Sequence, residues 1–496
     1  MAQRYYTLSL KDAIFPMLSE QQARTIIGGS ESTDPGATAT KPSISYCHNV
    51  MPAQDGLNSV GYLQIVPPYS PVTITFSDTR IIYGSNRSRL YLAFDSDGGI
   101  YVLKTDAIFW FKLTETAPVS VNEITIGTVN GTSYIYYKGV KCVKYNETTD
   151  ALDDVPLTGL SASSVLGVVA SYGYLLAYTT ESIAWSSTVD PTDFTPSAAT
   201  GAGGGNVAGI GGAIIFALAN SLGILIYTET NTIAGTYTGN VKYPFKYREV
   251  DNSKGGISLD FVAYEANSAA QFVYSKAGLQ SLTSQKAENI LPMVTDFLAG
   301  KKFEDFDEST KTFTLTSLTA TMKKKIKFVA SRYLIMSYGI TEFTHALVFD
   351  TALNRMGKLK VTHVDCFEYV GSQQEVSKES IAFLLATGEV NVLDFSTTAT
   401  SDGVVILGKV QYARGRKITL LGAEVENVDS DATLSVSSQA CVDGKTITTI
   451  PGTELLTVDN LRKYAFRFTA INHSLLLIGK FNLTTLFVIY TLNGRR

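Results

Sequence analysis

The chain has 496 residues, of which 45% are hydrophobic and 17% charged, and its formal net charge is −4. This length predicts two or three domains, and this composition excludes broad disorder. The weak negative charge gives no sign of a general nucleic-acid binder, although a protein that surrounds DNA without gripping it would carry the same charge.

Residues 1–75 have little periodic hydrophobicity and differ in this from the rest of the chain. One helix is expected at Leu18–Ile27, where Ser19 and Glu20 suit an N-terminal turn. The remainder of the segment is a connector rich in turn residues and an extended stretch bounded by prolines. We therefore expect 1–75 to be an extended docking segment that packs on another domain or subunit, and we expect the neighbouring domain to fold without it.

Residues 76–404 contain short strand-like segments in groups. The first groups run over 89–113, 123–145, 165–186 and 207–237, and Leu90, Ile124, Leu166 and Ala208 hold similar places at spacings of 34, 42 and 42 residues. Later groups fall within 260–282, 325–360 and 381–393. Units of about 40 residues with three or four antiparallel strands are typical of β-propeller blades. The aromatic residues, 27 Tyr and 24 Phe, also favour strands.

Two stretches of this region are unusual. Trp185–Gly205 contains prolines that cannot lie inside a central strand and ends in glycines, so it predicts a long irregular surface loop after a short strand. Gly209–Tyr227 is uncharged and nearly long enough to span a bilayer. Because Asn220 and Ser221 interrupt it at the centre, two buried strands explain it better than a membrane helix.

Residues 285–310 break the rhythm of the strands and are expected to be an insertion that projects from a blade. They combine a short helical part, Asn289–Ala299, with an acidic cluster of Glu304, Asp305, Asp307 and Glu308. The insertion either faces a channel or carries a fibre. The lysine-rich run Lys323–Lys327, next along the chain, is expected to be a solvated turn, with contact to phosphate or an acidic partner as the alternative.

Residues 405–496 have longer segments in which apolar and polar residues alternate, which predicts a separate C-terminal antiparallel sheet or sandwich. The expected fold class is therefore all-β: a propeller-like domain over 76–404, an accessory β-sandwich or sheet domain over 405–496, and few short helices.

The sequence offers no catalytic, cofactor-binding or metal-binding site. Its four cysteines, Cys47, Cys142, Cys366 and Cys441, are far apart and are expected to be free buried thiols. The four histidines, His48, His345, His363 and His473, have no neighbours at metal-ligand spacing and are expected to be structural. The run Asp95–Gly99 suits a hairpin turn better than a calcium loop. No nucleophile elbow, P-loop or dinucleotide fingerprint is present, so no enzyme is expected.

Several phrases resemble the tail nozzle, or tail hub, proteins of short-tailed bacteriophages. They are IAWSSTVDPTDFTPSAATGAGGG, GIGGAIIFALANSLGILIYTETNTIAGTYTG and YPFKY in the middle, MPAQDGLNSVGYLQI near the start, and YAFRFTAINHSLLLIGKFNLTTLFVIYTLNGRR at the end. The resemblance thus covers the middle and both ends of the chain, and it includes no catalytic signature.

This resemblance implies a structural virion protein of the tail. It implies a homo-oligomeric ring, usually a hexamer, at the distal end of a short tail, enclosing the channel through which phage DNA leaves without sequence-specific binding. The implied partners are the portal-adaptor or tail-tube ring and tail fibres or spikes. The competing class is a carbohydrate-binding or carbohydrate-processing propeller, which would use two carboxylates for hydrolysis or aromatic platforms for sugar binding.

Overall fold

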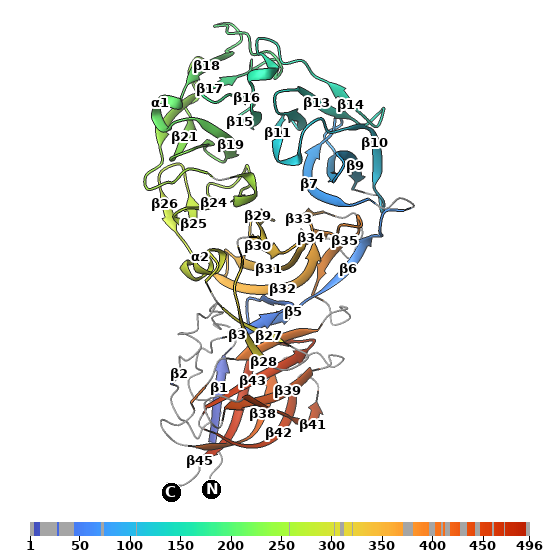
Figure 1. The fold of residues 1–496 in the computed structure, drawn as a ribbon, viewed down its shortest axis with the longest axis vertical. Coiled ribbons are helices and arrows are strands. Elements are labelled where there is room, and N and C mark those ends of the chain that lie inside the picture. Colours follow the sequence, from blue (N-terminus) through green and yellow to red (C-terminus); the bar gives the residue numbers. More distant parts are fainter. Residues whose placement is uncertain are drawn as a thin grey trace.

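The computed structural model describes residues 4–9, 27–28, 44–70, 74–105, 107–256, 258–301, 303–307, 312–319, 321–370, 380–395, 402–407, 410–411, 417–426, 434–441, 447–458, 461–470 and 472–492. Within them the protein consists of a large disc of β-sheets and a smaller β-sandwich below it, and both ends of the chain lie at the sandwich (Figure 1).

The disc is a β-propeller of seven blades, counted over the described residues. Blade 1 has β7 (Phe76–Tyr83), β8 (Arg89–Asp95), β9 (Gly99–Lys104) and β10 (Phe111–Thr116); blade 2 has β11 (Ile124–Val129), β12 (Thr132–Tyr137), β13 (Lys141–Asn146) and β14 (Ala151–Asp154). Blade 3 has β15 (Gly167–Ser171), β16 (Tyr174–Tyr178), β17 (Ser182–Trp185) and β18 (Gly203–Asn206); blade 4 has β19 (Ile214–Asn220), β20 (Gly223–Thr228), β21 (Thr232–Tyr237) and β22 (Phe245–Glu249). Blade 5 has β23 (Val262–Ala263), β24 (Gln271–Ser275), β25 (Gly278–Leu282) and β26 (Ala287–Asn289); blade 6 has β29 (Lys323–Val329), β30 (Tyr333–Gly339), β31 (Phe343–Asp350) and β32 (Arg355–His363). Blade 7 has β33 (Asp365–Tyr369), β34 (Ser380–Leu384) and β35 (Val390–Asp394), and its outermost strand is β6 (Gly61–Val66), which comes from before blade 1.

The middle strands of the blades are buried on both faces because each blade packs against two neighbours. In β16 and β20 every residue is buried, and β20 lies within the uncharged stretch that resembled a membrane span. The structure resolves that stretch into the hairpin β19–β20, with a short helix, α1 (Ala208–Gly211), before it. None of the helices in the described residues is long and apolar enough to cross a membrane. The predicted all-β propeller fold is thus confirmed.

The smaller domain packs two sheets face to face. One sheet contains β1 (Arg4–Ser9), β45 (Thr485–Leu492), β38 (Ile418–Glu426), β42 (Leu461–Ala470) and β41 (Thr453–Val458) in that order. The other contains β2 (Ile27–Gly28), β37 (Val410–Gln411), β43 (Asn472–Gly479), β36 (Gly403–Leu407), β3 (Ile44–His48), β39 (Leu434–Cys441) and β40 (Ile447–Pro451). Strands from both ends of the chain therefore build this sandwich.

Residues 1–75 are not a separate docking segment, and this expectation was wrong in its boundary. Strands β1 and β3 complete the sandwich, and β6 closes blade 7. Between them, β4 (Val50–Pro52) and β5 (Leu57–Ser59) extend the sheet of blade 6 in the order β32–β4–β5–β44, where β44 is Asn482–Leu483. Of the predicted helix 18–27, only Ile27 lies in the described residues, and it belongs to strand β2. Strands β1, β2, β3 and β6 pair with residues hundreds of positions away, so no neighbouring strand in the sequence reveals them.

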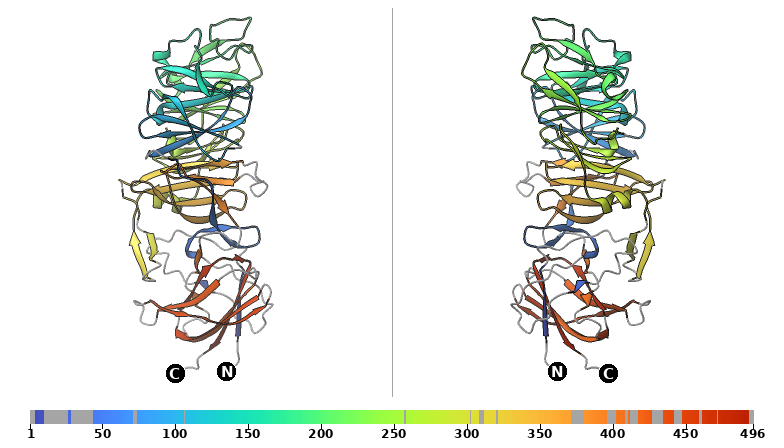
Figure 2. Two further views of the ribbon diagram at one scale, coloured as in Figure 1. Left: turned by 90° about the vertical axis from the view of Figure 1, so that its right-hand side faces the viewer. Right: turned by 90° about the vertical axis from the view of Figure 1, so that its left-hand side faces the viewer.

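The expected insertion at 285–310 is also smaller than predicted. Strand β26 belongs to blade 5, and the next element, helix α2 (Pro292–Leu298), buries Val294, Phe297 and Leu298 in the core. Only the hairpin β27 (Phe303–Asp307) and β28 (Thr312–Thr316) leaves the blades. It extends from the propeller towards the sandwich, where β27 lies beside β3 (Figure 2). Three residues of the acidic cluster lie on β27, and Glu308 lies outside the described residues.

The loop within Trp185–Gly205 is ordered by contacts to blade 2. The Phe194 side chain is buried against residues of blades 2 and 3, and its backbone N–H donates to the Thr158 carbonyl at 2.8 Å. The Trp185 indole N–H donates to the Gly201 carbonyl at 2.9 Å. The glycine tail is not irregular, because Gly203–Asn206 forms β18, the outer strand of blade 3.

Candidate functional site: the central channel of the propeller

The innermost strand of every blade lines a cavity of about 380 Å³ along the propeller axis. The wall formed by blades 3 and 4 is apolar, with small side chains such as Ala170, Ala217 and Ala219. The opposite wall carries charged side chains from blades 1, 5, 6 and 7. The channel is therefore polarised across its width.

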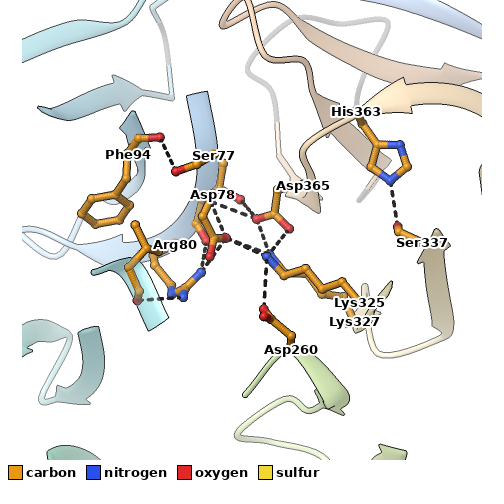
Figure 3. Close-up of polar contacts among 12 residues, drawn as sticks. Ser77, Asp78, Arg80, Phe94, Asp260, Lys325, Lys327, Ser337, His363 and Asp365 are labelled. Carbon is orange, nitrogen blue, oxygen red and sulfur yellow. Dashed lines mark hydrogen bonds and ion pairs between the residues drawn. The ribbon is translucent and has the colours of Figure 1, made fainter. Parts of the chain in front are cut away.

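The charged wall is one connected ionic cluster (Figure 3), which we define as Asp78, Arg80, Asp260, Lys325, Lys327 and Asp365. The Lys325 ammonium lies 2.9 Å from Asp78 Oδ1, 3.0 Å from Asp365 Oδ1 and 3.9 Å from Asp260 Oδ1. Lys327 pairs with Asp365 Oδ2 at 2.5 Å, and Arg80 pairs with Asp78 at 2.7 Å. The cluster thus joins four consecutive blades, 5, 6, 7 and 1.

The electrostatics of the cluster hold Asp78 and Lys325 charged. Burial by itself would raise the pKa of Asp78, but Arg80, Lys325 and Lys327 outweigh it and keep this pKa well below its usual range. Burial would likewise lower the pKa of Lys325, and Asp365 and Asp78 raise it instead. A carboxylate held ionised in this way does not suit the general acid that glycoside hydrolysis requires.

The cluster lies where the ring of blades closes. Asp365 on blade 7 accepts hydrogen bonds from the Thr79 backbone N–H at 2.9 Å and the Thr79 hydroxyl at 2.6 Å on blade 1. At the same seam Arg89 pairs with Glu368 at 2.7 Å, and the Trp110 indole donates to the Gly388 carbonyl at 2.8 Å. These contacts join blade 7 to blade 1, and β6 completes blade 7 as its outermost strand.

The lysine run was misread from the sequence. Lys325 and Lys327 lie on strand β29 and share the face that meets the aspartates, because side chains two apart point the same way. Lys324 points to the other face and donates to the Leu298 carbonyl at the end of α2. The only sequence signal for this arrangement was the alternating spacing within the run.

The histidines and cysteines sit as expected for structural residues where the structure describes their side chains. The Nδ1 of the buried His363 lies 2.9 Å from the Val361 carbonyl oxygen, and its Nε2 lies 2.7 Å from the Ser337 hydroxyl. Since a carbonyl only accepts, Nδ1 carries the proton of the neutral ring and Nε2 accepts from Ser337, so Nδ1 has no carboxylate partner of the kind found in a catalytic triad. Cys47, Cys142 and Cys366 are free and buried, and burial raises each thiol pKa to about 12.

Two buried histidines predict acid sensitivity. Burial lowers the pKa of His363 in the propeller and of His473 in the sandwich to about 4. The folded pKa of each histidine lies below its pKa in the unfolded chain. The free energy of unfolding is therefore not reduced by these histidines above pH ~6.5, and each of them lowers it by about 3 kcal/mol as the pH drops towards 4. Urea unfolding at pH 7 and pH 4.5 measures this loss of stability. The variant His363→Gln should remove about half of the loss that the two histidines cause. The same change at the half-buried His345 should alter it much less, and an equal effect would contradict the assignment.

No group of three or more His, Cys, Asp or Glu side chains within the described ranges is arranged to hold a metal ion. The turn at Asp95–Gly99 is a hairpin turn, as predicted: the Asp95 carboxylate accepts from the backbone N–H groups of Asp97 and Gly99 and from the Tyr101 hydroxyl.

No protein-family model matches the chain, and no curated protein matches it. Among solved structures the chain is similar to the WD40 β-propeller domain of Doa1, with 9% identity and a TM-score of 0.39 over 69% of this chain and 100% of that one. It is also similar to the β-propeller domain of Cps50 (Swd1) from Myceliophteria thermophila, with 8% identity and a TM-score of 0.40 over 67% of this chain and 99% of that one. The propeller fold itself follows from the strand pairing described above.

Proposed function

We propose that this protein is a non-enzymatic structural component of a short phage tail: the nozzle, or hub, of the virion. Subunits form a homo-oligomeric ring, six in number as the sequence resemblance implies, and the ring encloses the channel for DNA ejection. The ring docks to the adaptor or tail-tube ring and carries fibres or spikes.

The observation that most supports this proposal is the continuous sheet and shared hydrophobic core at the joint between the two domains. The sheet of blade 6 continues through β4 and β5 into β44, and one hydrophobic cluster contains Leu334 of blade 6, Phe297 of α2 and Leu477 of the sandwich. Arg355 of blade 6 also donates to the carbonyls of Ala53 and Gly56 at 2.8 and 2.9 Å. A subunit without a hinge at this joint suits a ring that must resist internal pressure.

The propeller's own axis does not suit the passage of DNA. Ion pairs join blades 1, 6 and 7 along one wall of the cavity, and the cavity holds only about 380 Å³. The DNA channel of the proposal therefore lies between subunits. The chain has a net charge of −4. A channel wall without an excess of positive charge lets DNA slide, whereas a wall dense in lysine and arginine would hold DNA through the release of counterions.

The test is the size of the full-length protein in solution. We expect native mass spectrometry and negative-stain electron microscopy to show closed rings of identical subunits, and immunogold labelling to find the protein at the tail tip of phage particles. A monomer at micromolar concentration that also fails to appear in particles would contradict the proposal. Turnover of a glycan that disappears on replacing one carboxylate would favour the carbohydrate-processing alternative.

Excision of the β27–β28 hairpin should leave the propeller intact. The backbone of Gly300 lies against the Leu318 carbonyl, so a two-glycine link can replace residues 302–317. Since the hairpin leaves the blades, we expect the midpoint of urea unfolding, followed by fluorescence of Trp110 and Trp185, to stay unchanged. Deleting 285–310 instead removes β26 and α2 and should unfold blade 5. Equal destabilisation by both deletions would show that the hairpin belongs to the core.

A further inference from the structure

The charged wall of the central cavity has more carboxylates than cations. The carboxylates that line the cavity or pair with its lining residues are Asp78, Asp260, Glu265, Asp365 and Glu368. The cations that do so are Arg80, Arg89, Lys325 and Lys327. All other residues that line the cavity in the described part of the chain are uncharged. The cavity therefore carries an excess of negative charge.

Two of these carboxylates have no close cation of their own among the described residues. The Asp260 carboxylate accepts no hydrogen bond there, and its nearest cation, the Lys325 ammonium, lies 3.9 Å away and has two nearer carboxylate partners. The Glu265 carboxylate accepts hydrogen bonds from the Ser331 backbone N–H at 2.6 Å and from the Ser331 hydroxyl. Because a carboxylate can accept about four hydrogen bonds, both residues keep free acceptor capacity.

Asp260 and Glu265 lie at opposite ends of the inner strand of blade 5. Asp260 belongs to the 3-10 turn Leu259–Phe261 before β23, and Glu265 follows β23 by two residues. Their backbones are therefore on the order of 10–15 Å apart along the strand, which is too far for one metal ion. Tyr264, which is 41% exposed, also lines the cavity and offers an aromatic ring and a hydroxyl.

The apolar wall of blades 3 and 4 limits the chemistry of a ligand further. Its Ala170, Ala217 and Ala219 side chains are small and apolar, so a methylene chain can pack on them. A sugar or a phosphate would leave polar groups without partners on this wall. The cavity volume of about 380 Å³ is within the range of small-molecule sites. The ligand that fits is long, apolar between its polar groups and positively charged.

We propose that the central cavity of the propeller binds a linear aliphatic polyamine. One ammonium group pairs with Asp260 and another with Glu265, and the ring of Tyr264 contacts the cationic chain between them. The methylene groups pack on the alanine side chains of blades 3 and 4. The proposal does not depend on the tail function, because it concerns the cavity within one subunit.

The test is isothermal titration calorimetry of the full-length protein with spermidine, together with the melting temperature. The comparison probes are putrescine, which is shorter, butylamine, which has a single ammonium group, hexanediol, which is uncharged, and Mg²⁺. The variants are Asp260→Asn and Glu265→Gln, which remove a charge and keep the size of the side chain, and Glu265→Gln retains an acceptor for Ser331. The matched control is Glu181→Gln, which removes the same charge from an exposed position on blade 3 outside the cavity.

We expect one spermidine to bind per chain and to raise the melting temperature, putrescine to bind more weakly, and butylamine and hexanediol not to bind. Each cavity variant should weaken spermidine binding by about tenfold or more, whereas Glu181→Gln should leave it unchanged. Because Asp260 has no hydrogen bond to lose, Asp260→Asn should keep the melting temperature of the ligand-free protein, which separates loss of the site from a folding defect.

Three results would overturn the proposal. The first is that spermidine does not bind. The second is that several molecules bind per chain or that equimolar Mg²⁺ displaces them, since either shows diffuse attraction to a negative surface. The third is that both cavity variants bind spermidine as tightly as the unchanged protein does.

Discussion

Deletion of residues 1–75 is expected to prevent both domains from folding. It removes β6 from blade 7, β4 and β5 from the joint, and β1 and β3 from the sandwich. It also removes fully buried apolar residues, among them Leu8, Ile44, Val50 and Val66. At about 1.5–3 kcal/mol for each buried side chain, the loss is comparable to the roughly 5–15 kcal/mol that stabilises a typical protein. The measurement is cooperative urea unfolding followed by tryptophan fluorescence, because both tryptophans, Trp110 and Trp185, lie in the propeller.

A shorter deletion separates the contribution of residues 1–75 to the sandwich from their contribution to the propeller. Removing residues 1–43 takes away β1 and β2 but leaves β3 to β6 in place. Tryptophan fluorescence should then still report a cooperative propeller, while amide hydrogen exchange should rise in β45, whose neighbour β1 is lost. A propeller that folds normally without residues 1–75 would show that β6 is dispensable and that these residues only dock.

The blades were predictable from the sequence where their strands are apolar. The middle strands of each blade are covered on both faces, so β16 and β20 appear as short uninterrupted apolar runs between turn residues. The innermost strand of blade 1 lies outside the predicted groups, because β7 reads FSDTRIIY and the first predicted group begins only at residue 89. Its polar residues belong to the ionic cluster, and a strand that carries Asp78 and Arg80 has no apolar pattern to reveal it.

The closure of the propeller and the candidate site have no local signal. Strand β6 pairs with β35, so Val66 lies opposite Val390, more than three hundred residues later in the chain. Nothing in the sequence of either strand indicates that the other is its partner. The ionic cluster likewise brings together residues near 78, 260, 325 and 365. Such pairings follow from the order of the blades around the axis, which a single sequence does not contain.

Replacing Asp365 by alanine is expected to destabilise the propeller by about 3–5 kcal/mol. Asp365 is fully buried and is the shared partner of Lys325 and Lys327, of which Lys325 is only 11% exposed. Removing the carboxylate leaves two ammonium groups close together with less compensating charge, and it also removes the acceptor for Thr79. The loss should appear as a lower urea midpoint by fluorescence, since Trp110 lies at the same seam.

A charge-compensated variant distinguishes the loss of the Asp365 charge from a simple loss of packing. Asp365→Asn keeps a hydrogen-bond acceptor for Thr79 but removes the charge, and combining it with Lys327→Met removes one of the two cations that depend on Asp365. The double variant should therefore be more stable than Asp365→Asn alone. Asp154→Ala is the matched control: its ion pair with Lys141 is largely exposed, at 67% and 43%, and its loss should cost less than about 1 kcal/mol. If Asp365→Ala cost no more than Asp154→Ala, the ionic cluster would contribute nothing to the closure of the ring of blades.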